Sequence, residues 1–477
     1  MRLLALGLAL APLFPFLGWL APLFLPGLRG LPRPVLGLLG FYAFSLLVPA
    51  LFAPESLALP LALFRVLYVL GLVGAGVVLA RRLSPEALAP LGYGLAFLYL
   101  SAFFATYLVY GDRAVGERLA HPFHNPVGLG LMGAVGVFLA LYLRYPWPFR
   151  LLLGLLGGAV LLLSGSRGGM LGFLLGGAGG LLFRRRGFWA LGLSGLLLGV
   201  AGFLDTPVTE RFFQTQLSGR EGLWLRAYEV YAAHPWTGVG PYLLGDHLKG
   251  TLFGDCFLFS LVEARGLTCP AWLGPLGGFW QFAHNHLLQA LGESGLWGAL
   301  GLALLVGGFL AAAWGDGLLF SLLLAYAAMG MVDNPFSVPS PFRGEIFFLA
   351  GGMALARGWI PLNRLMALAT GVILLWALPF WQLALSPAPP PPGLAYAALG
   401  QEGGVVRLQG GEGYRVQVWL CAKACRRVGW EWDGSKPIAF SLPGDLPPGR
   451  YRLRVLLFAP SRSVQKPLYV LEREVER

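Results

Sequence analysis

The chain has 477 residues, of which 56% are hydrophobic and only 12% are charged, and its mean hydropathy is +0.67. Roughly a quarter of the residues of a soluble domain are charged, so the composition excludes an ordinary soluble protein. The net charge of +12 is not gathered into a basic run with interleaved aromatic residues. The sequence therefore argues against nucleic-acid binding.

A membrane core about 30 Å thick is crossed by roughly 20 apolar residues in a helix. By this measure the sequence predicts an all-α polytopic membrane protein with about twelve transmembrane helices. The expected spans are 3–25, 34–53, 62–80, 88–110, 126–143, 148–164, 168–183, 187–204, 286–313, 316–332, 344–357 and 364–385.

Arginines are concentrated in five short gaps between these spans. They are Arg29, Arg33, Arg81, Arg82, Arg144, Arg150, Arg184, Arg185, Arg186, Arg357 and Arg364. Because basic residues gather in cytoplasmic loops, we expect these gaps inside and the alternate loops outside. Eight spans then put the N-terminus outside, whereas Arg2 favours the inside. Either the first segment enters the membrane differently, or it is a processed signal-like segment.

The chain divides by composition into five parts. Residues 1–204 and 286–385 are predicted transmembrane helices, and 205–285 form a large extracytoplasmic loop. The run SPAPPPPG at 386–393 is a stiff proline-rich linker. Alternating segments such as YRVQVWL and YRLRVLL then predict a small extracytoplasmic β-sandwich-like domain over 394–477, which we expect to contact the acceptor or an envelope protein.

The four cysteines, Cys256, Cys269, Cys421 and Cys425, all lie in parts expected outside, where disulfides persist. Pairing of Cys256 with Cys269 and of Cys421 with Cys425 is one interpretation, and a zinc site is a weaker one.

Three polar segments stand out at the predicted outer face. The first, SGSRGG at 164–169, is either a binding element or a turn with a snorkelling arginine. The second runs from Arg220 through HPWTGVGP at 234–241, where a tight loop either presents amides to an anion or caps a helix. The third, HNHLLQALGESGLWG at 284–298, carries a histidine suited to accept a proton, or one that only caps a helix.

Together these segments resemble the O-antigen ligase and polymerase family of membrane glycosyltransferases. Weaker matches are PFHNPVG at 122–128 and Asp333-Asn334-Pro335, and the resemblance covers about residues 110–340. It implies an enzyme of the bacterial cytoplasmic membrane, with its active site outside and with an undecaprenyl-diphosphate-type lipid-linked oligosaccharide as donor. The resemblance also implies an acceptor hydroxyl on a lipid core or a protein.

The resemblance assigns the catalytic roles to Arg167, Arg220 and His284. Guanidinium groups bind phosphate oxygens bidentately, so the two arginines would hold the diphosphate, while His284 would deprotonate the acceptor hydroxyl. Six further residues are expected to shape the substrate pocket or to support it structurally: Arg226, Glu221, His124, Arg118, His234 and Asp333. The loop acids, such as Asp246, form no clustered pair, so we predict metal-independent catalysis without a cofactor.

Two other functions compete with a ligase. A polymerase of the same family would join lipid-linked repeat units, and its product would be a ladder of lengthening glycans. A transporter or flippase for lipid-linked sugars is a different class. Transporters place charges near the membrane midplane and often carry an inverted repeat, whereas here the polar residues gather at the outer face.

Overall fold

The structure is a computed structural model of the whole chain. It describes residues 2–82, 85–183, 186–204, 206–213, 220–248, 281–339, 343–358, 360–385, 391–400, 402–411, 414–422, 425–431, 434–442, 447, 449–458 and 467–476. The expected Cys256–Cys269 pair, Arg184 and Arg185 and most of the linker at 386–390 lie outside these residues.

The chain forms two compact units, and each is described by itself. The first, helical unit contains Met1–Gln216 and Val230–Pro379. The second unit contains Leu217–Glu229 and Phe380–Arg477.

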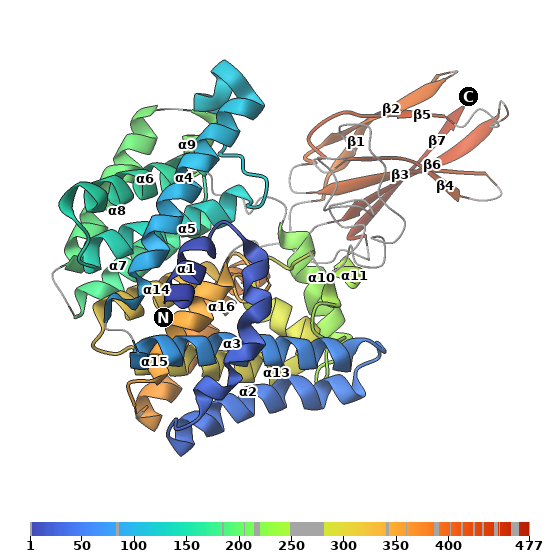
Figure 1. Ribbon diagram of the computed structural model, residues 1–477. Coiled ribbons are helices and arrows are strands. Elements are labelled where there is room, and N and C mark those ends of the chain that lie inside the picture. The colour runs from blue at the N-terminus through green and yellow to red at the C-terminus, as the bar shows by residue number, and fades with distance from the viewer. Residues whose placement is uncertain are drawn as a thin grey trace. The chain divides into compact units, whose positions relative to one another are not determined.

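The helices run along the chain from blue to orange in Figure 1. In the N-terminal half they are α1 (Arg2–Leu10), the 3-10 helix η1 (Pro15–Leu28), α2 (Arg33–Phe52), α3 (Ala58–Arg82), η2 (Pro85–Leu88), α4 (Ala89–Tyr110), η3 (Gly111–Gly116), α5 (Pro126–Tyr142), α6 (Trp147–Leu163), α7 (Arg167–Leu181), α8 (Arg186–Leu204) and α9 (Pro207–Glu210). They continue as α10 (Arg220–Ala233), α11 (Leu244–Leu248), α13 (His286–Ala312), α14 (Gly317–Met329), α15 (Gly344–Leu355) and α16 (Leu362–Leu385).

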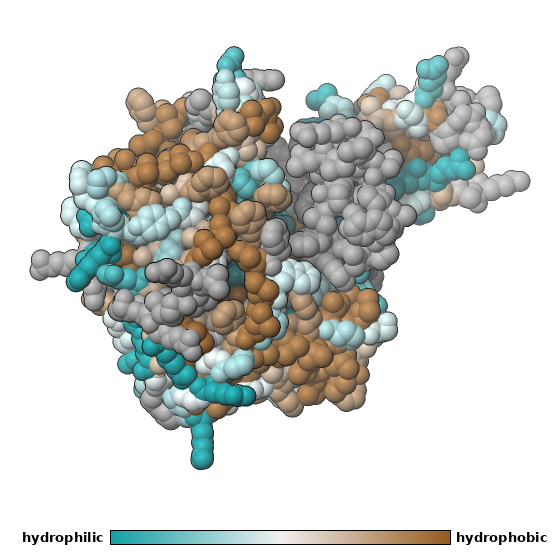
Figure 2. All heavy atoms as spheres, in the orientation of Figure 1, coloured by the Kyte–Doolittle hydropathy of each residue, from teal (hydrophilic) through white to brown (hydrophobic). Residues whose placement is uncertain are grey.

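Six helices within the described residues are long and apolar enough to cross a membrane. They are Arg33–Phe52, Ala58–Arg81, Glu86–Tyr110, Arg186–Leu204, His286–Ala312 and Leu362–Trp381. Large apolar side chains are exposed on the helical unit, including Phe203 at 88% and Phe104 at 64%, and hydrophobic residues cover much of it in Figure 2. Such a surface suits lipid contact, so the mostly helical, multi-pass character is confirmed, whereas a total of twelve spans stays an expectation.

The first expected span, 3–25, differs from the structure. It is broken after α1, and the chain continues as η1, which contains Pro22 and Pro26. Proline lacks a backbone N–H and clashes with the preceding turn, so Pro12 and Pro15 account for the break after α1, and Pro22 and Pro26 for the lack of a regular α-helix beyond it. Glycines instead bring η1 against α3, because a Cβ on Gly71 would lie only 2.3 Å from the Ala21 carbonyl oxygen.

Glycine contacts also hold α7 among its neighbours. A Cβ on Gly172 would lie 2.7 Å from the carbonyl oxygen of Ala325 on α14, and one on Gly169 would lie 2.8 Å from the carbonyl carbon of Gly130 on α5. Small residues at these crossings let the helix backbones approach closely. These contacts hold the first turns of α7 against α5 and α14, and Arg167 is the first residue of the helix.

The C-terminal β region has two antiparallel sheets, drawn in orange to red in Figure 1. One sheet has the order β1-β2-β5 and the other β4-β3-β6-β7. The strands are β1 (Gly393–Leu399), β2 (Gly403–Gln409), β3 (Arg415–Cys421), β4 (Cys425–Glu431), β5 (Ile438–Ser441), β6 (Arg450–Phe458) and β7 (Tyr469–Glu476). Alternate residues of both sheets, such as Val418, Val455 and Val406, share one apolar core.

Candidate active site

The His284-Asn285-His286 segment is fixed by its central residue. Asn285 is fully buried and caps α13, since its side-chain oxygen accepts a hydrogen bond from Leu288 N at 3.1 Å. Its amide nitrogen donates to the carbonyl oxygens of Met331 at 2.9 Å and Trp376 at 2.7 Å. The capping role weighed for the histidines therefore belongs to the asparagine between them.

His284 forms a pair with Asp333. The His284 backbone has a left-handed φ of 52°, and Nδ1 lies 2.8 Å from Asp333 Oδ1. The Asp333 side chain is 1% exposed and also accepts from Asn334 N at 3.1 Å, whereas the His284 side chain is 26% exposed. A buried carboxylate thus orients a partly exposed imidazole, an arrangement suited to general base chemistry.

His286 has different surroundings from His284. It is buried, its ring meets Phe336 edge-on at 4.8 Å between centroids, and its Nδ1 lies 3.4 Å from Asn334 Nδ2. His286 belongs to the apolar packing of α13.

The SGSRGG segment is a tight turn between α6 and α7. Gly165 has φ of 58°, and Ser166 caps α7 by accepting from Gly169 N at 3.0 Å. Arg118 Nε donates to the Ser164 carbonyl oxygen at 2.8 Å, so one of the expected pocket residues supports this turn. Arg167 follows the cap and is half-buried at the first position of α7.

The start of α7 lies beside the segment that carries Asp333. A Cβ on Gly168 would lie 3.0 Å from Val332 Cγ2 and 3.6 Å from Met329 Cγ. Asp333 follows Val332 directly and binds His284. The structure therefore brings SGSRGG, Asp333-Asn334-Pro335 and His284-Asn285-His286 into one neighbourhood, although they are far apart in the sequence.

The GVGP loop at 238–241 packs against α13. Val239 N donates to the Gly292 carbonyl oxygen at 3.0 Å, and Gly240 N to that of Glu293 at 2.8 Å. Tyr242 N donates to Glu293 Oε1 at 3.0 Å. These amides are bonded within the protein, which favours the structural interpretation of this loop over the anion-binding one.

Glu293 is the centre of a buried polar cluster that sequence reasoning did not identify. Its carboxylate forms a hydrogen-bonded ion pair with Arg65 of α3, and Oε1 also accepts from Gln289 at 2.7 Å. The Arg65 guanidinium lies 3.9 Å from the ring centroid of Tyr242. An arginine inside the apolar span 62–80 was the available signal, since an intramembrane charge needs a partner.

His124 is buried and makes polar contacts with distant parts of the chain. Its Nε2 lies 2.8 Å from the Pro12 carbonyl oxygen and 3.0 Å from Arg343 Nη2. Burial, with a smaller contribution from Arg343, holds the pKa of His124 well below its usual value of 6.5. His124 is thus a neutral, interior side chain.

Arg343 also borders an apolar cavity of about 460 Å³ among α1, η1, α3, α4 and α15. Apolar residues such as Leu8, Phe24 and Leu72 line most of it, and the polar lining consists of Arg343 and Glu345. The combination of an apolar wall with a polar end suits an amphiphile.

The other expected site residues lie around α10. Arg226 pairs with Glu229 at 3.1 Å, and the Glu221 side chain is outside the described residues. The His234 backbone ends α10, where its N–H donates to the Val230 carbonyl oxygen at 3.1 Å. Arg220 is half-buried at the start of α10 and belongs to the second unit, whereas Arg167 and His284 belong to the first. That the three side chains form one site stays a prediction.

Comparison with known families bears on all three motifs. Residues 152–303 match the family model described as O-antigen ligase. This confirms the resemblance to the O-antigen ligase family. No curated protein matches the chain.

The O-antigen ligase match spans SGSRGG, Arg220, the GVGP loop and His284-Asn285-His286. It indicates a membrane glycosyltransferase of the O-antigen ligase or polymerase type, which works on lipid-linked glycans. Asp333 and Arg65 lie outside the matched residues, yet the structure connects both to the O-antigen ligase segment.

Proposed function

We propose that this protein moves a glycan from an undecaprenyl-diphosphate-type carrier to a hydroxyl group of a lipid core or a protein, without a metal ion. The observation that carries the proposal is the His284–Asp333 pair, at 2.8 Å, beside the start of α7. The family match supplies the class of reaction.

His284 is the general base in this proposal. Because the Asp333 carboxylate accepts from Nδ1, the imidazole proton is held on Nδ1 and Nε2 is the basic nitrogen. Nε2 takes the proton from the acceptor hydroxyl as its oxygen attacks the anomeric carbon. Asp333 stabilises the imidazolium that forms, so it acts as a positioning residue.

The arginines act on the leaving group. As the new glycosidic bond forms, the bond between the anomeric carbon and the diphosphate oxygen breaks, and the diphosphate leaves on its lipid. Arg167 lies at the N-terminus of a 15-residue helix, where the helix dipole also favours an anion. Arg167 and Arg220 together would hold the diphosphate, and a single displacement inverts the anomeric configuration.

The apolar cavity beside Arg343 supports a lipid-linked donor, because its lining suits part of a hydrocarbon chain. We place the site on the extracytoplasmic side, as the distribution of arginines predicts. The Cys421–Cys425 disulfide supports the same side for the β region, since disulfides persist in oxidising compartments.

The test is transfer by purified protein from a lipid-diphosphate-linked oligosaccharide to candidate acceptors. We expect His284→Ala to slow transfer by about 10²–10⁴-fold. Arg167→Ala and Arg220→Ala should each slow it by about 10- to 100-fold, because each removes charge-assisted hydrogen bonds. Arg150→Ala, at an exposed position in an expected cytoplasmic gap, is the matched control.

Unchanged transfer by both His284→Ala and Arg220→Ala would refute these roles. Loss of turnover with a chelator, restored by a divalent cation, would refute the metal-independent mechanism. A ladder of lengthening lipid-linked glycans, instead of one transfer to a new acceptor, would identify the polymerase.

A further inference from the structure

The outer face of the β4-β3-β6-β7 sheet carries a row of arginines. On β6 the inward residues Tyr451, Leu453 and Val455 are buried, whereas Arg450, Arg452 and Arg454 are exposed at the alternate positions. Side chains two residues apart in a strand share a face and are spaced by about 6.8 Å. Three guanidinium groups therefore follow one line across the outside of the sheet.

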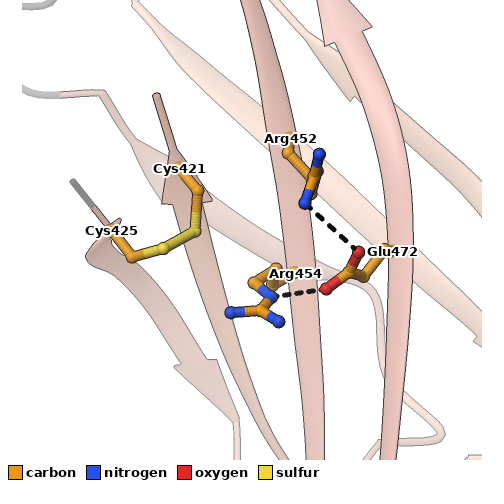
Figure 3. The surroundings of a disulfide bond; sticks show 5 residues. All are labelled: Cys421, Cys425, Arg452, Arg454 and Glu472. Atoms are coloured by element: carbon orange, nitrogen blue, oxygen red, sulfur yellow. Dashed lines mark hydrogen bonds and ion pairs between the residues drawn. A yellow bond between two sulfur atoms is a disulfide. The ribbon is translucent and has the colours of Figure 1, made fainter. Parts of the chain in front are cut away.

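These arginines border a hollow at the end of β3. It has a volume of about 540 Å³ and is lined by Cys421, Ala422, Cys425, Arg450, Tyr451, Arg452, Arg454 and Glu474. The Cys421–Cys425 disulfide closes the β3–β4 turn at its edge, and Figure 3 shows it near Arg452 and Arg454. The lining holds three arginines and one glutamate. Glu472 and Glu476 of β7 stand opposite Arg454 and Arg450, and Arg427 of β4 stands opposite Trp419, so guanidinium groups alternate with carboxylates on this face and exceed them by one.

Glu472 orients two of the arginines. Its carboxylate accepts from Arg454 Nε at 2.5 Å and lies 3.9 Å from Arg452 Nη1, as Figure 3 shows. Both arginine side chains remain exposed, at 44% for Arg454 and 60% for Arg452. One carboxylate cannot use the many donors of two guanidinium groups, so donors remain directed to the surface.

An aromatic side chain lies beside the arginines. In the sheet register Trp419 on β3 stands opposite Arg454 on β6 and Arg427 on β4. Its Nε1 donates to Gln417 Oε1 at 3.2 Å, which holds the ring on the outer face. An indole beside guanidinium groups offers an apolar ring surface together with charged donors.

We propose that this face binds an oligosaccharide that carries carboxylate or phosphate groups. The arginines would bind the anionic groups, Trp419 would pack against a sugar ring, and Gln417 and Glu474 would bind hydroxyl groups. An anionic membrane surface is a poorer occupant, because Glu472, Glu474 and Glu476 stand opposite the arginines and interrupt the continuous positive surface that an anionic bilayer needs. An oligosaccharide can place single anionic groups against the arginines and a sugar ring against Trp419. The proposed binding does not depend on the transfer mechanism, so it can be tested by measuring the affinity for the oligosaccharide alone.

The experiment uses the full-length protein in nanodiscs of neutral lipid, with tetragalacturonic acid as the anionic probe and its methyl ester as the neutral one. Affinities are measured by calorimetry at two salt concentrations. We expect binding of the acid, weaker binding of the ester and a loss of affinity with salt. The Arg452→Gln/Arg454→Gln double variant should bind the acid at least about tenfold more weakly, and Trp419→Ala about fivefold more weakly.

Two variants separate binding by this face from a general effect of charge or folding. Arg407→Gln removes an exposed arginine from the other sheet and should leave the affinity unchanged. Glu474→Gln removes a carboxylate from the hollow and should tighten binding of the acid, which damage to the fold would not do.

Equal binding of acid and ester, or equal affinity of the Arg452→Gln/Arg454→Gln and Arg407→Gln variants, would overturn the proposal. The proposal would also fail if the wild-type protein bound vesicles of anionic lipid, and the Arg452→Gln/Arg454→Gln variant lost this vesicle binding but still bound the acid normally. The His284→Ala variant should bind the acid normally, so failure of the transfer mechanism and failure of this site give different results.

Discussion

His284 Nδ1 lies 2.8 Å from Asp333 Oδ1, so residues 49 positions apart form one hydrogen-bonded pair. Asp333→Asn should lower kcat by about 10- to 100-fold with little change in KM. The substitution removes the negative charge of Asp333, and that charge stabilises His284 most strongly once its imidazole has taken up the proton. Steady-state transfer kinetics measure both constants.

Asp112→Asn, at an exposed position of η3, is the matched control and should retain the kcat of the parent. A rise in KM with kcat unchanged would instead show that Asp333 binds substrate directly.

Breaking the buried ion pair between Arg65 and Glu293 should destabilise the helical unit. Its side chains are 9% and 2% exposed, and removing one partner leaves a buried charge uncompensated. Arg65→Met should therefore lower the free energy of unfolding by about 3–5 kcal/mol. Thermal unfolding in detergent would measure the loss.

Arg357→Gln breaks the exposed Arg357–Asp316 pair and should cost about 1 kcal/mol or less. The Arg65→Met/Glu293→Gln variant should recover part of the loss, because it no longer buries a lone carboxylate. Equal effects of Arg65→Met and Arg357→Gln would contradict this account.

Gly295 allows α13 to bend against the GVGP loop. Its φ is 62°, and a Cβ there would lie 2.4 Å from the Trp236 carbonyl carbon. Gly295→Ala should destabilise the protein by about 1–3 kcal/mol, from backbone strain and the forced displacement of that segment. Gly192→Ala on α8 meets nothing within 4 Å and should be neutral or slightly stabilising in the same unfolding assay.

His124 should make stability depend on pH. Burial lowers its pKa in the folded protein, so the unfolded chain binds a proton more readily below about pH 6.5. Stability from the neutral imidazole is thus present above that pH and is lost as the pH falls below it. Unfolding temperatures from pH 8 to pH 5 should decline less steeply for His124→Gln than for the parent, and parallel curves would contradict the assignment.

The sequence by itself determined the class of protein, the small β region and the three motifs. These properties are local: apolar runs, period-two alternation as in YRVQVWL, and short polar segments can all be seen without knowing the fold. Even there, the break between α1 and η1 was missed, since hydropathy does not register how prolines interrupt a helix.

Only the tertiary structure decided which polar side chains contact one another. Asp333 and Arg118 were expected either to shape the substrate pocket or to support it, and the structure shows Asp333 bound to His284 and Arg118 bound to the SGSRGG turn. Arg65 and Glu293 are 228 positions apart, and their pairing depends on how α3 and α13 cross. Such contacts arise from helix packing, which depends on many weak apolar and glycine contacts at once, so no short segment of sequence encodes them.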